Sequence, residues 1–128
     1  MKYLLDSHVF VWLFAKHNLV GGTARALLNN SDSEVFVSLA TLWELELKHS
    51  KGRFAYSAHE LQKAMSDLGV SELIIKREHI LLSSKAGVKH TDPFDLMLCA
   101  QAIAEDMTLV TADQILLKNF PNSIDARL

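Results

Sequence analysis

The chain has 128 residues, 49% of them hydrophobic and 22% charged, and a formal net charge of −2. This length suits one compact domain with a buried core, so we expect a single domain over residues 1–128. The near-zero charge gives no sign of a nucleic-acid partner. The single cysteine, Cys99, excludes an internal disulfide and a cysteine-built zinc site, and its apolar neighbours favour a buried position.

The chain lacks the long apolar runs that enter membranes. Asp6 interrupts the apolar run at the N-terminus, which argues against the core of a signal peptide. No other apolar stretch has the length needed to span a bilayer. We therefore expect a cytoplasmic protein with no membrane partner.

Short apolar runs alternate with helical segments along the chain. The first half predicts a strand at residues 3–5, a buried helix or turn at 8–14, a helix at 23–29, a strand at 34–38, a helix from Ser38 towards Gly52 and a helix at 57–69. The second half predicts a strand at 72–75, helices at about 78–86 and at 92–106, a strand at 108–111, a helix at 114–118 and a weak strand at 123–124. Strands separated by helices imply a parallel sheet with helices on both faces.

Capping residues mark the ends of several predicted helices. Ser38 is a suitable N-cap for the helix that follows it. Ser57 and Glu60 have the spacing of a capping box, and Gly69 is the expected end of that helix. Asp92, followed by a proline, predicts the start of the longest helix.

Four acidic residues from distant segments are expected at the carboxyl edge of this sheet. Asp6 directly follows the first strand, and Asp113 lies two residues beyond the fourth. Glu44 and Asp95 lie near the starts of two helices, and a helix that follows a parallel strand starts at this edge. For Asp95 this requires the preceding helix, at about 78–86, to lie across the top of the sheet, which the sequence leaves open.

Clustered carboxylates favour a bound metal. Like charges raise one another's pKa and disfavour ionisation, and a divalent cation removes that penalty. Oxygen ligands select a hard cation, so we expect Mg²⁺ or Mn²⁺. Such ions activate water for attack on a phosphodiester and stabilise the leaving oxygen. The pattern therefore predicts phosphodiester hydrolysis.

Each acid also has a simpler structural interpretation. Asp6 and Asp113 could cap the helices that follow them. Asp95 stands three residues after Asp92, where a carboxylate favours the helix dipole. Glu44 and Glu46 lie in one apolar helix and cannot both face the core, so one of the two is expected in solvent. Taken singly, these residues do not define a site, and the hypothesis depends on their common location.

The remaining polar residues give weaker indications. The six histidines lack the pair spacing of a zinc-binding helix. His90, with His8, lies near the proposed edge, where it could contact substrate or simply be solvated. Lys48, Lys51 and Arg53 form a basic patch that is either a solvated helix face or a phosphate contact.

Four ordered segments resemble the PIN domain, and specifically the VapC-type toxin ribonucleases of type II toxin–antitoxin systems. They are Tyr3-Leu4-Leu5-Asp6-Ser7-His8, then Ser38-Leu39-Ala40-Thr41-Leu42-Trp43-Glu44 with Lys48 and Gly52, then His90-Thr91-Asp92-Pro93-Phe94-Asp95 with Leu98, Ala100, Gln101 and Ala102, and finally Thr111-Ala112-Asp113. Any one of these segments is weak evidence, but their order along nearly the whole chain is specific.

The resemblance implies a three-layer α/β/α sandwich with a central parallel sheet and an acidic pocket that binds Mg²⁺ or Mn²⁺. The family's pocket acids match Asp6, Glu44, Asp95 and Asp113, a supporting hydroxyl matches Thr111, and Ser7 stands where threonine is common. Proteins of this family are typically dimeric RNA endonucleases inhibited by a cognate antitoxin. Leu96 departs from the pattern because the family often has arginine there, which puts a phosphate or antitoxin contact in doubt.

Two other functions are compatible with the same residues. The first is a catalytically idle PIN-like module that holds RNA or a partner peptide at the same edge. The second is a phospho-acceptor signalling domain, which also gathers aspartates at a parallel-sheet edge. That class places its acceptor aspartate after the central strand, whereas the second and third predicted strands end in Ser38 and Ile75.

Overall fold

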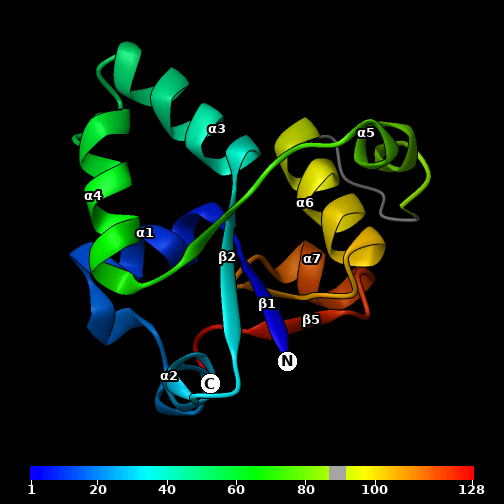
Figure 1. The fold of residues 1–128 in the computed structure, drawn as a ribbon, viewed down its shortest axis with the longest axis horizontal. Helices are drawn as coiled ribbons and strands as arrows, with labels where there is room; N and C mark the ends of the chain where they lie inside the picture. Colours follow the sequence, from blue (N-terminus) through cyan, green and yellow to red (C-terminus); the bar gives the residue numbers. More distant parts are fainter. Residues whose placement is uncertain (87–91) are drawn as a thin grey trace.

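The computed structural model describes residues 1–86 and 92–128, and these form a parallel sheet between two layers of helices (Figure 1). The sheet has the order β3-β2-β1-β4-β5, and each neighbouring pair is parallel. Its strands are β1 (Lys2–Leu5), β2 (Glu34–Ser38), β3 (Ser71–Leu73), β4 (Thr108–Thr111) and β5 (Ser123–Asp125). The predicted α/β/α sandwich with a central parallel sheet is confirmed.

The helices occupy most of the connections between strands. They are α1 (Ser7–Ala15), η1 (His17–Leu19), α2 (Gly22–Asn29), α3 (Leu39–Ser50), α4 (Ala58–Leu68), α5 (Arg77–Ser83), α6 (Pro93–Ala104) and α7 (Gln114–Asn119). The segment expected as a helix or turn at residues 8–14 is therefore helical. The helix expected at about 78–86 ends earlier, at Ser83.

The third strand is shorter than the sequence predicts. It was expected at residues 72–75, but β3 runs from Ser71 to Leu73. Its partner β2 sets this limit, because Ser38, the last residue of β2, pairs with Leu73. The chain then leaves β2 for helix α3, so Ile74 and Ile75 have no strand beside them.

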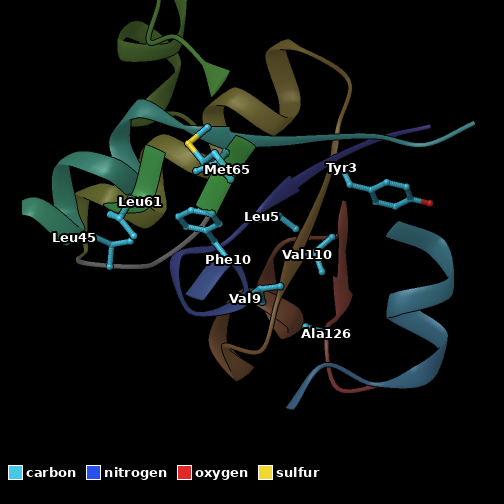
Figure 2. Packing of buried hydrophobic residues seen from close by; sticks show 10 residues of the cluster. Tyr3, Leu5, Val9, Phe10, Leu45, Leu61, Met65, Val110 and Ala126 are labelled. Atoms are coloured by element: carbon cyan, nitrogen blue, oxygen red, sulfur yellow. The ribbon is translucent and has the colours of Figure 1, made fainter. Parts of the chain in front are cut away.

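Alternate residues of the central strand point to opposite helical layers. Tyr3 and Leu5 belong to a buried cluster with side chains of α1, α3 and α4 (Figure 2). Leu4 belongs to a second cluster, formed with residues of α6 and α7. This period of two explains how one apolar run supplies both cores of a sheet that is covered on both faces. Cys99 lies fully buried in the second cluster, as expected, and burial raises the pKa of its thiol to about 12.

The predicted helix caps are present. Ser38 Oγ accepts the N–H of Ala40 at the start of α3. Ser57 and Glu60 form the capping box of α4, each side chain accepting the other's backbone N–H. Gly69 ends α4 in the left-handed conformation, with φ of 70°. Asp92 Oδ1 accepts a backbone N–H in the first turn of α6, so this helix begins as the sequence predicts.

Helix α5 packs against α6 (Figure 1). The link from α5 to α6 includes residues 87–91, and His90 therefore lies outside the described residues. Helix α6 still brings its first turn, with Asp95, next to α3. Within the part of the chain that the structure describes, no helix combines the length and the apolar character needed to cross a membrane.

Candidate functional site

The order of the strands creates a topological switch point between β1 and β4. From β1 the chain moves outward to β2 and β3, then returns to the other side of β1 to form β4. Helical connections therefore diverge between β1 and β4, which is where parallel sheets form ligand sites beyond their carboxyl ends. Asp6 follows β1 and Asp113 follows β4, so both lie at the carboxyl edge beside this switch point.

Asp6 is the most deeply placed of the four predicted acids. Only 5% of its surface is exposed. Its Oδ1 accepts the N–H of Ser7 at 2.7 Å, and its Oδ2 accepts the hydroxyl of Thr111 at 2.7 Å. Burial raises the pKa of Asp6 above its usual value, while these two hydrogen bonds act in the opposite direction. The carboxylate is thus fixed in position and has been removed from most of its solvent.

Thr111 links the acids of β1 and β4. While its hydroxyl donates to Asp6, its Oγ1 accepts the backbone N–H of Asp113 at 3.0 Å. Asp113 Oδ1 in turn accepts two backbone N–H groups at the start of α7. The capping interpretation of Asp113 is therefore correct, and its position beside Thr111 also agrees with a place in the pocket.

Glu44 reaches the same region from α3. Its Oε1 accepts the hydroxyl of Ser7 at 2.5 Å, and its Oε2 forms an ion pair with Lys48 at 3.3 Å, one turn further along the helix. Ser7 thus joins the first turn of α1 to α3. The hydrogen bond from Ser7 and a side chain that is only 12% exposed turn Glu44 away from solvent. Of the two glutamates Glu44 and Glu46, Glu44 is therefore not the solvated one.

The pKa of Asp95 is strongly raised by its surroundings. Its pKa rises from 3.8 to about 8, first because burial removes solvent and then because of the charges of Asp6, Asp92, Glu44 and Asp113. All three other predicted acids are therefore near enough to act on it. The structure brings the four carboxylates of the sequence hypothesis into one electrostatic cluster.

Asp92 also contributes to this cluster, although the sequence analysis treated it only as a helix cap. Its charge raises the pKa of Asp95, three residues further along the chain. Residues three apart lie on the same face of a helix, and this spacing is the signal that could have revealed the second role.

The donor set fits a hard divalent cation. Its polar atoms are carboxylate oxygens, which Mg²⁺ and Mn²⁺ prefer. Burial, and after it the charges of the neighbouring acids, raises the pKa of Asp95, and a bound divalent cation would oppose this by favouring the ionised carboxylate. Asp6, Glu44, Asp95 and Asp113 are the residues that would hold such a cation.

A second group of possible ligands lies between α5 and the end of α6. One atom each from Glu78, His79 and Glu105 falls within 4.8 Å of the other two. However, His79 Nδ1 accepts the backbone N–H of Lys76, so the ring proton is on Nε2, which donates to Glu105 at 2.9 Å. With both ring nitrogens engaged, fully buried His79 serves to join α5 to α6.

Leu96 shows how this chain departs from the expected pattern. It stands where arginine was expected from the resemblance, and it packs against the buried cluster beneath α6. An aliphatic side chain there adds to the core and leaves no charged group to reach the site.

Comparison with known families decides the relationship. A family model of the PIN domain matches residues 3–120. The chain belongs to the PIN domain family. No curated protein sequence matches this PIN domain significantly.

Solved structures resemble this PIN domain over almost its full length. VapBC2 from Rickettsia felis, bound to a DNA fragment from its promoter, contains a chain with 21% identity and a TM-score of 0.68, covering 98% of this chain and 97% of that one. VapBC-1 from nontypeable Haemophilus influenzae gives 18% identity and a TM-score of 0.68, with 100% of both chains covered. A toxin–antitoxin complex from Klebsiella pneumoniae gives 18% identity, a TM-score of 0.68 and 95% coverage of both. At these identities the likeness shows the fold.

Proposed function

We propose that this PIN domain is a divalent-metal-dependent RNA endonuclease and the toxin of a toxin–antitoxin pair. The observation that carries the proposal is the carboxylate cluster, in which burial and then four acidic neighbours raise the pKa of Asp95 to about 8. Such a cluster destabilises the metal-free protein, and its chemistry suits a cation that binds phosphodiesters.

The residues of the chain have separable roles in this proposal. Asp6, Glu44, Asp95 and Asp113 hold Mg²⁺ or Mn²⁺ through carboxylate oxygens. When bound, the cation supplies an activated water and neutralises charge on the leaving oxygen. Thr111 orients the Oδ2 of Asp6 by donating its hydroxyl proton, and the carboxylate therefore keeps its remaining lone pairs for a cation.

Ser7 and Lys48 position the carboxylate of Glu44. The Ser7 hydroxyl donates a hydrogen bond to Glu44 Oε1, and Lys48 forms an ion pair with Oε2. Together they hold this carboxylate in place before a cation binds. Because Lys48 is partly exposed, it is also available to a substrate phosphate.

The toxin role rests on family and structural likeness. The structures similar to this chain include VapBC complexes and a toxin–antitoxin complex. We infer a cognate antitoxin, a homodimer and action on cytoplasmic RNA. A short reading frame directly upstream, whose product binds this chain and blocks cleavage, is the expected genetic context.

The test is cleavage of RNA by the purified chain with Mn²⁺ or Mg²⁺. Asp6→Asn and Asp95→Asn are expected to abolish cleavage, whereas Asp32→Asn, which changes an exposed aspartate, keeps it. Equal activity of all four proteins would refute the site assignment. Calorimetry separates the alternative of an idle binding module, because that module would bind no Mn²⁺ at millimolar concentration.

A further inference from the structure

A groove of about 380 Å³ opens beside the carboxylate cluster, between the end of α3 and the start of α6. Helices α3 and α6 contact each other, and Trp43 of α3 meets Phe94 in the first turn of α6. Glu44 and Asp92 line the groove at the end near the cluster, and Leu47, Lys51, Arg53 and Phe94 line the remainder. The groove is therefore continuous with the proposed metal site.

Two cations of this groove have no acidic partner within the described ranges. Lys51 and Arg53 are exposed, and neither forms an ion pair there, in contrast to Lys48. They lie on a tight turn after α3, in which Gly52 has φ of 70° and Arg53 N donates to the backbone carbonyl of Lys48. Cations near a helix C-terminus also favour the helix dipole, but that effect needs no groove.

An exposed aromatic side chain flanks the same groove. Trp43 lies one helical turn before Leu47, and 60% of its surface is exposed. Its ring meets the ring of Phe94 edge to face, with centroids 5.3 Å apart and an interplanar angle of 72°. This contact fixes the indole while most of its surface stays in solvent. An exposed, oriented indole beside unpaired cations is the combination that binds unstacked bases and phosphates.

Lys48 and Arg53 also line a second hollow, which Ser7, His8 and Trp12 border. These two cations therefore lie between the groove and the second hollow. A strand bound in the groove could reach the second hollow along them.

We propose that this groove binds the nucleotides next to the cleaved bond of a single-stranded RNA. One base stacks on Trp43, and the neighbouring phosphates contact Lys51 and Arg53. The inference rests on the proposed nuclease function and adds the substrate's structure to it. A duplex keeps its bases stacked and paired, so it cannot place one on the indole, and the substrate is an unpaired segment.

Binding is measured with a fluorescein-labelled single-stranded RNA of twelve nucleotides, in Ca²⁺ to avoid cleavage and over a range of salt concentrations. The double variant Lys51→Ala/Arg53→Ala is expected to reduce the slope of log affinity against log salt by about 1.4, since each phosphate contact on a single strand contributes about 0.7. A matched double variant, Lys63→Ala/Lys118→Ala, removes two exposed cations elsewhere and keeps the wild-type slope.

Stacking has its own readouts. Trp43→Ala is expected to weaken binding about 5- to 100-fold with little change in the salt slope, and Trp43→Phe to restore part of it. The chain has two tryptophans, so Trp12→Phe leaves Trp43 as the only one, and RNA should then quench its fluorescence. The same sequence in a duplex is expected to bind more weakly and to leave this fluorescence unchanged.

Wild-type affinity in both groove variants, or equal binding of duplex and single strand, would overturn the inference. The first result would assign the groove to another class of partner, such as a protein segment. Cleavage and Mn²⁺ binding are measured separately. If all groove variants cut RNA as well as the wild type, only the inference about the groove is refuted. If the chain binds RNA at the groove but does not cut it, the proposed nuclease function is refuted.

Discussion

Replacing Asp95 by asparagine is expected to stabilise the metal-free protein, by an amount that grows with pH. The pKa of Asp95 is about 8 in the folded chain because of burial and four acidic neighbours, against an ordinary value of 3.8. Folding therefore takes up a proton at neutral pH. Asparagine resembles the protonated carboxyl in shape and has no proton to lose. The stability of the variant therefore does not depend on pH through this position.

The sign and size follow from the raised pKa. Asp95 costs no stability below about pH 4, where it is protonated in both states; the cost then grows as the pH rises and is complete above about 8. One pKa unit corresponds to about 1.4 kcal/mol, which sets an upper bound near 6 kcal/mol for this shift. Asp95 is partly exposed, so solvent screening lowers the expected gain of Asp95→Asn to about 2–3 kcal/mol at pH 9.

The assay is urea unfolding in EDTA at intervals from pH 5 to pH 9. The difference in free energy of unfolding between Asp95→Asn and wild type should widen with pH and level off above about 8. Asp32→Asn is the control for an exposed aspartate and should keep the wild-type profile. Excess Mn²⁺ should reverse the order, because it stabilises the wild type more than the variant. A stability difference that stays constant over this pH range would refute the electrostatic reasoning.

Three further substitutions test other contacts. Thr111→Val removes both hydrogen bonds of a buried hydroxyl, so it should lower the free energy of unfolding in urea by about 1–3 kcal/mol. It should also weaken Mn²⁺ binding in calorimetry. Thr108→Val on the same strand is the control and should have neither effect. Gly21→Ala places a Cβ against the backbone of Arg127 and Leu128 and should lower the melting temperature, whereas Gly22→Ala meets no atom within 4 Å and should not. Glu105→Gln removes a carboxylate whose pKa is lowered chiefly by the hydrogen bond from a buried histidine, so it should destabilise the protein by up to about 1 kcal/mol at pH 7, a difference that disappears as the pH falls below about 4 in acid titration.

Much of the local structure could be predicted from the sequence. The caps accept hydrogen bonds from backbone N–H groups within a few residues, as Ser57, Glu60 and Asp92 do, and a proline follows Asp92. The sequence alone therefore predicts where these helices start. The location of Asp6 and Asp113 could also be predicted, because residues that directly follow parallel strands lie at the carboxyl edge of the sheet.

Other features depended on the neighbours that folding provides. The end of β3 follows the length of β2, which the apolar run at residues 72–75 does not reveal. The electrostatic effect of Asp92 on Asp95 could not be separated from its capping role in the sequence, because it depends on how deeply Asp95 is buried. The hydrogen bond from Thr111 to Asp6 joins residues 105 apart in the chain, and the resemblance, not spacing, suggested it.

The sequence by itself therefore determined about where helices and strands begin and which acids follow strands, since these depend on near neighbours in the chain. The tertiary structure decided that β1 lies between β2 and β4, and that α6 brings Asp95 near three other predicted acids. The raised pKa of Asp95 has no counterpart in local sequence, because desolvation and charge–charge interactions depend on distances that only the packed chain sets.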